Sequence, residues 1–131
     1  MNGCKAVTLL ELIIVVTIIG ILSTLGVGQW LAARERALDN EARANLRIII
    51  AAGRIDRLES STGTYTAYGT TGTLNSGLHL VLPATKWTYL TTVNTTPTPP
   101  VYCAQATRVT TGRTWRLRST EQNPVRDGTC P

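Results

Sequence analysis

The sequence predicts one long N-terminal helix followed by several short strands, the two kinds of element that make up an α+β protein. Proline is missing from the first 82 residues, and apolar residues recur there at helical spacing. Beyond residue 85, short runs rich in Thr, Tyr, Trp and Val are separated by turn-forming residues, which is typical of strands. The 131 residues allow one ordinary domain, and the hydrophobic fraction of 43% excludes a disordered chain.

The first part of the predicted helix is apolar enough to cross a membrane. Between Val7 and Ala33 the only charged residue is Glu11. About 20 apolar residues in a helix span the hydrocarbon of a bilayer, and Trp30 followed by two arginines is typical of the interface at the end of such a segment. A cleaved secretory signal, a plain anchor and a more specific membrane segment are the three interpretations.

Glu11 favours the third interpretation. A carboxylate in hydrocarbon is costly unless it finds a partner, so an acid within a membrane segment is a functional candidate by default. A plain anchor or a secretory signal gains nothing from it. A secretory signal would also need a cleavage site after the apolar run, and Gly26-Val27-Gly28 is a poor one.

The second part of the predicted helix, residues 34–59, is amphipathic. Its apolar residues, together with Leu31 just before it, follow helical spacing, which predicts a single apolar face: Leu31, Leu38, Ala42, Leu46, Ile49, Ile55 and Leu58. A helix from Val7 to Glu59 would be about 80 Å long at 1.5 Å per residue, and Gly63 would follow its end. Three glycines, at positions 20, 26 and 28, make Gly20–Gly28 its weakest stretch, because each glycine costs about 1 kcal/mol relative to alanine.

The remainder, residues 61–131, predicts a small polar head. Residues 61–85 are interpreted as a loop. Three strands are expected over Lys86–Val93, Val101–Val109 and Thr114–Ser119. The tail from Thr120 onward has no periodicity. The aromatic residues of the head are expected in the core and in cross-strand pairs.

Two of the three cysteines, Cys103 and Cys130, lie in this head, and neither has the spacing of a zinc or redox motif. A head outside the cytoplasm would favour a disulfide between them, and a cytosolic head would favour two free thiols. His79 has no ligand residues at metal spacing. No residue pattern predicts catalysis, so the sequence predicts neither an enzyme nor a metal site.

The segment from Ala6 to Leu22, AVTLLELIIVVTIIGIL, resembles the N-terminal signature of type IV pilins and pseudopilins. The resemblance implies that prepilin peptidase cleaves between Ala6 and Val7 and that Val7 is then N-methylated. Thr8 and Glu11 coincide with the family's Thr and Glu and would serve filament assembly. The family usually has Gly before the cut and Phe after it, where this chain has Ala and Val.

The same resemblance implies a domain organisation. Residues 1–6 would be the leader, 7–33 the transmembrane and filament-core helix, and 34–60 the amphipathic helix segment. Residues 61–131 would form the head, with a loop, a three-stranded antiparallel sheet packed against the helix, and a C-terminal loop held by a Cys103–Cys130 disulfide.

The implied function is that of a structural subunit of a type IV pilus, without a cofactor. The subunit would leave the bacterial inner membrane through the pilus assembly machinery and form a helical, homo-oligomeric extracellular filament used in adhesion, motility or DNA uptake. A pseudopilin of a type II secretion system and a minor or priming pilin are the alternatives. The disulfide favours the pilus, because major pseudopilins more often use a calcium loop, and the tail offers only Glu121 and Asp127 as carboxylates.

Charge suggests one further partner. Residues 60–131 carry six basic side chains against two acidic ones. Such a balance favours either binding of nucleic acid or a solvated basic face.

Overall fold

The computed structural model describes residues 7–96 and 98–131, without the side chains of residues 25 and 26. The chain divides into two compact units between Leu38 and Asp39. In its described residues, the first unit contains the N-terminal part of one helix. The second contains the rest of that helix and the head.

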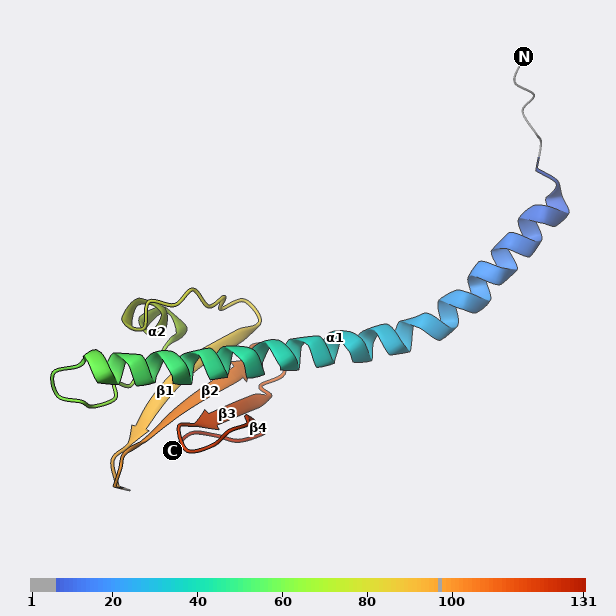
Figure 1. The fold of residues 1–131 in the computed structure, drawn as a ribbon. Helices are drawn as coiled ribbons and strands as arrows, with labels where there is room; N and C mark the ends of the chain where they lie inside the picture. The colour runs from blue at the N-terminus through green and yellow to red at the C-terminus, as the bar shows by residue number, and fades with distance from the viewer. Residues whose placement is uncertain (1–6, 97) are drawn as a thin grey trace, which may run out of the picture. The chain divides into compact units, whose positions relative to one another are not determined.

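Helix α1 runs without interruption over Leu9–Glu59, 51 residues (Figure 1). It ends where the sequence predicts but begins two residues later than Val7. The reason is Thr8, whose side-chain oxygen accepts a hydrogen bond from the backbone N–H of Glu11 at 3.3 Å and so caps the helix. After Glu59 the chain turns through Gly63, at φ +61°, a backbone conformation that glycine adopts readily.

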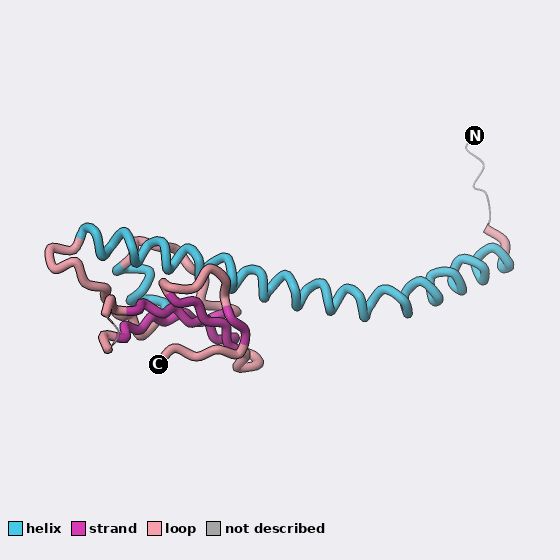
Figure 2. Tube along the Cα trace, turned by 60° about the horizontal axis from the view of Figure 1, so that its bottom comes forward, coloured by secondary structure: helices cyan, strands magenta, loops and turns pink. Residues whose placement is uncertain are grey.

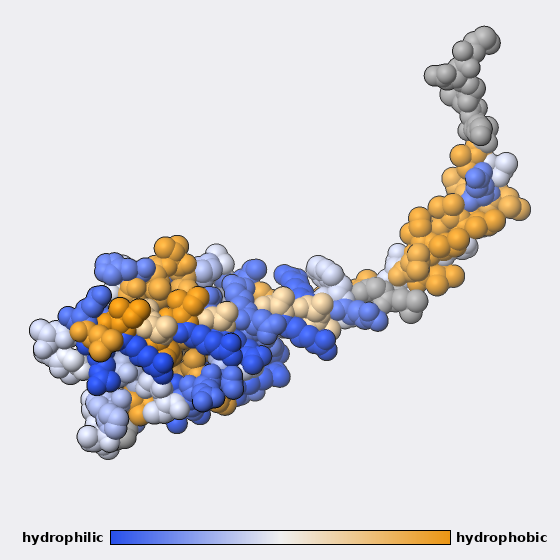
Figure 3. Space-filling model, viewed as in Figure 1, coloured by the Kyte–Doolittle hydropathy of each residue, from blue (hydrophilic) through white to orange (hydrophobic). Residues whose placement is uncertain are grey.

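Within the first unit, the helix is apolar and open to its surroundings (Figure 3). It is long and apolar enough to cross a membrane, and the window with this property is not buried at all. Its hydroxyl groups do not disturb this character, because Thr17, Ser23 and Thr24 donate hydrogen bonds to carbonyl groups three or four residues earlier. The segment therefore presents no unpaired side-chain hydroxyl at these three positions.

The head is built on an antiparallel sheet in the order β1-β2-β3-β4. The strands are β1 (Trp87–Asn94), β2 (Val101–Arg108), β3 (Thr114–Arg118) and β4 (Val125–Arg126). In the register, Ala106 of β2 lies between Tyr89 and Trp115. The long helix with a small antiparallel sheet is the predicted α+β fold, and the first three strands fall within one residue of the predicted ranges.

Two predictions about the head are wrong. The sheet has a fourth strand, β4, which at two residues is too short to show periodicity in the sequence. The predicted loop also contains a short helix, α2 (Thr71–Gly77). A capping box starts it, in which the side chains of Thr70 and Thr73 each accept a hydrogen bond from the other's backbone N–H.

The core of the second unit lies between α1 and one face of the sheet, and the helix lies over that face (Figure 2). Leu46 and Ile49 face it from the helix, and Trp87, Tyr89 and Tyr102 face it from the strands. The aromatic core is thus confirmed for these three residues and for Trp115.

One assignment on the helix is wrong. Leu38, Ala42, Leu46 and Ile49 are buried, as one apolar face requires. Leu31, in the first unit, is 49% exposed. Ile55 and Leu58 are instead 57% and 84% exposed. At about 100° per residue, these two residues point away from the buried row, so the helix has two apolar faces.

Candidate functional site

The first turn of α1 carries the charged group of the apolar segment. Thr8 immediately precedes the helix, its hydroxyl oxygen accepts from the Glu11 N–H and its carbonyl accepts from the Leu12 N–H at 3.2 Å. Glu11 therefore lies where free backbone N–H groups make the helix end positive, which favours a carboxylate. The Thr-x-x-Glu spacing is the sequence pattern of a capping box, and it would have located this helix start.

The surroundings of Glu11 are apolar and exposed. Val7 is 64% exposed, and the leucines and isoleucines on both sides of Glu11 are each about half exposed or more. An ionised carboxylate on such a surface is stable in water, but in hydrocarbon it needs a cation. The Glu11 carboxylate therefore needs a positively charged partner once apolar groups cover this surface.

The three glycines singled out by the sequence lie inside α1. Gly20, Gly26 and Gly28 all have helical backbone, so α1 is continuous through this stretch. A side chain on Gly20 or Gly28 would meet no atom within 4 Å. Packing inside the described chain therefore does not require glycine at these two positions, and their role in flexibility stays a prediction.

The comparison with known families decides what this segment is. Residues 1–27 match the family described as the prokaryotic N-terminal methylation motif. The chain carries a prepilin-type signature. This signature is that of type IV pilins and pseudopilins, and it implies processing by prepilin peptidase and assembly into a pilus-type filament. No curated protein and no solved structure matches the chain.

The prepilin-type signature extends over the residues that the sequence assigns to processing. Ala6, on the leader side of the predicted cut, lies outside the described residues, as does the whole 1–6 segment. Val7, Thr8 and Glu11 all lie within the described part of the matched region. Cleavage before Val7 and its methylation stay predictions.

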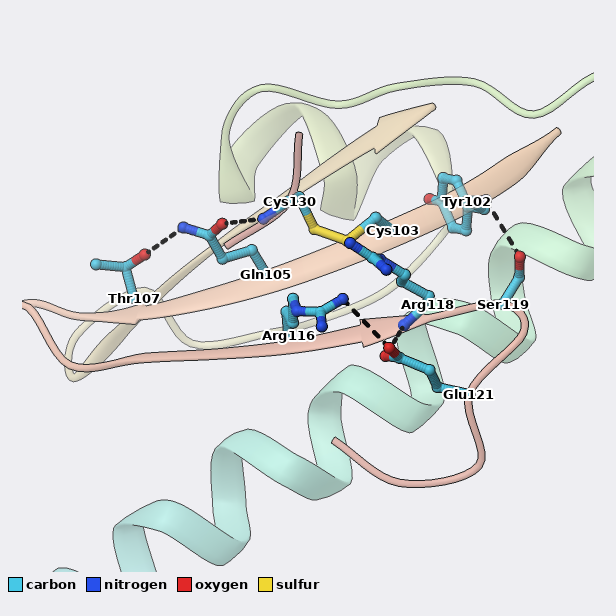
Figure 4. The surroundings of a disulfide bond; sticks show 9 residues. All are labelled: Tyr102, Cys103, Gln105, Thr107, Arg116, Arg118, Ser119, Glu121 and Cys130. Carbon is cyan, nitrogen blue, oxygen red and sulfur yellow. Dashed lines mark hydrogen bonds and ion pairs between the residues drawn. A yellow bond between two sulfur atoms is a disulfide. The ribbon is translucent and has the colours of Figure 1, made fainter. Parts of the chain in front are cut away.

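The second region of interest is the C-terminal tail, which a disulfide joins to β2 (Figure 4). Cys103 and Cys130 are bonded, with their Cα atoms 5.8 Å apart. The backbone N–H of Cys130 donates to the side-chain oxygen of Gln105 at 2.8 Å. Cys103 follows Tyr102 in the strand, so it lies on the sheet face opposite α1.

Several other contacts hold the tail. The sequence did not predict them, because the tail shows no periodicity. The carboxylate of Glu121 accepts from the guanidinium of Arg116 at 3.2 Å and from the backbone N–H of Arg118 at 3.1 Å (Figure 4). The Asp127 N–H donates to the Thr114 carbonyl at 2.8 Å. The tail is therefore fixed at several points along its length and not by the disulfide alone.

The described residues of the head give little support for a metal site or for nucleic-acid binding. Within residues 7–96 and 98–131, no cluster of three His, Cys, Asp or Glu side chains could hold a metal ion. His79 is exposed. Three arginines of the basic head pair with carboxylates: Arg113 with Asp39, Arg116 with Glu121 and Arg126 with Asp127. Binding of nucleic acid stays a prediction.

Proposed function

We propose that this chain is a structural subunit of a type IV pilus, held in the inner membrane as a precursor and assembled by the pilus machinery into a helical extracellular homo-oligomer. One observation carries the proposal: the N-terminal part of α1 is apolar and unburied, and it begins with a capped turn bearing Glu11. Exposed apolar surface of this extent is stable in a bilayer or against other apolar helices. A membrane-held precursor and a polymer provide these two environments in turn.

Glu11 would direct the assembly of the polymer. Cleavage before Val7 creates an α-amino group four residues from Glu11 in sequence. In the filament core, the Glu11 carboxylate of one subunit would pair with the Val7 amine of its neighbour. Removing one partner of such a buried pair costs about 3–5 kcal/mol, because the other charge is left bare.

The head favours a pilus over a secretion pseudopilus. Glu121 is already bound by Arg116 and by the Arg118 backbone N–H, and Asp127 pairs with Arg126 at 3.6 Å. Both carboxylates therefore already have partners within the head, and the Cys103–Cys130 disulfide is one of the contacts that hold the tail. This is the arrangement that the resemblance associates with pili.

The test removes the charge of Glu11 and keeps its shape. We expect Glu11→Gln to remain in the membrane but to give few or no surface filaments by electron microscopy, and Glu11→Asp to retain part of the yield. A variant that is not cleaved after Ala6 should fail in the same way, because it lacks the Val7 amine. A membrane-stable Glu11→Gln protein with wild-type filament yield would contradict the proposal.

Deletion of the gene distinguishes a pilus subunit from the alternative, a pseudopilin. Loss of surface filaments supports the pilus subunit. Loss of protein secretion with surface filaments intact would identify a pseudopilin.

A further inference from the structure

A hollow on the head lies where α1 ends and the chain turns back (Figure 1). Its volume is about 530 Å³, which is within the size range of small-molecule sites. It lies entirely within the second unit. The residues that line it are Arg54, Arg57, Leu58, Ser60, Gly63 and Tyr65. We call this hollow the arginine pocket.

Arg57 is held at the arginine pocket by neutral groups. Its Nε–H donates to the Gly63 carbonyl at 2.9 Å, and its Nη1 donates to the Tyr65 hydroxyl at 3.4 Å. The guanidinium also lies over the Tyr65 ring, 4.9 Å from the ring centroid. That ring stacks in turn on the buried ring of Tyr102. Arg57 is therefore anchored to the core in a fixed direction, and its charge is not neutralised.

Arg54 lies one helical turn before Arg57 and is also held by a neutral group. Its Nη2 donates to the Ser119 carbonyl at 2.8 Å. Neither arginine forms an ion pair with a carboxylate among the described residues. A guanidinium carries more N–H donors than these contacts use, so both arginines can also bind an oxyanion. Like charges at this spacing on a helix repel each other, and an anion between them would relieve that repulsion.

The carboxylates near these arginines lie on other surfaces. Asp56 and Glu59 follow the two arginines by two residues each, which places them roughly 200° around the helix. They line a separate hollow beside His79. Glu121 of the tail is already bound to Arg116. The C-terminal end of α1 contributes about half a negative charge, which is less than the charge of the two guanidinium groups. The arginine pocket is therefore electropositive.

From this arrangement we infer that the arginine pocket binds a sugar phosphate, with the phosphate monoester between Arg54 and Arg57. Such a group carries about −1.5 to −2 charges at pH 7, which matches two guanidinium groups. Arginine also binds phosphate oxygens through two parallel hydrogen bonds. The Ser60 and Tyr65 hydroxyls can hydrogen-bond to sugar hydroxyls, and Leu58 offers an apolar flank. The pocket lies outside the prepilin-type signature, and its binding does not depend on the proposed function.

The test is calorimetric titration of the full chain, in a neutral detergent, with glucose 6-phosphate. We expect saturable binding, weaker binding of inorganic phosphate and no binding of glucose. Arg54→Gln with Arg57→Gln should lower the affinity for glucose 6-phosphate by about tenfold or more, because hydrogen bonds to charged groups are the stronger ones. The matched control is Arg36→Gln with Arg126→Gln, which removes the same charge from two exposed arginines that do not line the pocket.

Three results would overturn the inference. Absence of saturable binding of glucose 6-phosphate, or equal losses in the two double variants, would exclude the arginine pocket as the site. Equal affinity for inorganic phosphate and glucose 6-phosphate would exclude a contribution of the sugar. Tighter binding of dihexanoyl phosphatidic acid than of glucose 6-phosphate would replace the sugar phosphate by a lipid headgroup.

Two milder variants guard against a misfolded double variant. Tyr65→Phe keeps the ring that stacks on Tyr102 and removes only the hydroxyl, so the affinity should fall by about two- to fivefold. Arg57→Lys keeps the charge but loses the planar contacts to Gly63 and Tyr65, so its affinity should lie between those of the wild type and Arg57→Gln. Wild-type affinity in both variants, with an unchanged melting temperature in the absence of ligand, would overturn the role of Arg57.

Discussion

Gly53 of α1 lies directly against the ring of Tyr102 in β2. A Cβ atom at position 53 would overlap the Tyr102 Cε1 atom and lie 2.9 Å from its Cζ atom. The ring has little freedom to withdraw, because the Tyr65 ring stacks on it with centroids 4.8 Å apart and planes at 6°. The helix therefore approaches the sheet closely at position 53, where the core has no side chain.

The first prediction follows from this contact. Gly53→Ala should lower the free energy of unfolding by about 1–3 kcal/mol through overpacking, even though alanine is the better helix former by about 1 kcal/mol. Chemical denaturation of the full chain in detergent, followed by tryptophan fluorescence, measures the change. Gly20→Ala is the matched control, since a side chain there meets no atom within 4 Å. Equal stability of Gly53→Ala and the wild type would contradict the contact.

The second prediction concerns alkaline pH. Burial raises the pKa of Tyr102 to about 12. Burial also raises the pKa of Tyr89. The unfolded chain ionises near pH 10, whereas the folded chain holds these protons longer. Stability should therefore be full below pH 10 and fall as pH rises from about 10 to 12, by roughly 2–3 kcal/mol for Tyr102.

Tyr102→Phe separates the two tyrosines. The Tyr102 hydroxyl is buried without a hydrogen-bond partner among the described residues, so its removal should cost little at pH 7. Denaturation midpoints between pH 8 and 12 should fall less steeply for Tyr102→Phe than for the wild type. Parallel curves for the two proteins would exclude Tyr102 as a cause.

The third prediction concerns the disulfide. Cys103 and Cys130 are 27 residues apart, and a bridge over that distance restricts the unfolded chain by about 3–4 kcal/mol in the chain-entropy model. Reduction or Cys130→Ser should lower the melting temperature and expose the tail from Thr120 onward to protease. The membrane helix should stay helical, because its stability comes from its surroundings.

Thiol labelling of the native, unreduced mature protein provides a direct check. The bridged protein should show no reactive thiol, since Cys4 would leave with the leader. Two reactive thiols per chain would refute the bridge.

The fourth prediction concerns Gly20–Gly28. This stretch is helical in the isolated chain, and we expect it to be the first to lose helical hydrogen bonds when subunits pack in the filament, because each glycine destabilises a helix by about 1 kcal/mol relative to alanine. Gly26→Ala with Gly28→Ala should make the segment stiffer and reduce filament stretching. A filament map with unbroken helix through this stretch in the wild-type protein would refute the prediction.

Features that depend on a local pattern of residues could be predicted from the sequence alone. The apolar run with Glu11 specified a membrane-length helix, and the absence of proline before residue 83 specified its continuity to Glu59. Alternating residues with turns between them located β1, β2 and β3 to within one residue. Each of these signals repeats over several residues, so neighbouring positions reinforce one another.

Features that depend on contacts between residues far apart in the chain could not be predicted in this way. The two residues of β4 pair because Trp115 and Arg116 offer them a strand edge, and no repeat of their own marks them. Ile55 and Leu58 read as core residues from spacing, yet they are exposed because the sheet covers the other side of the helix. The need for glycine at position 53 arises from Tyr102, 49 residues later in the chain. Spacing shows that a helix has apolar faces, but only packing selects which face becomes the core.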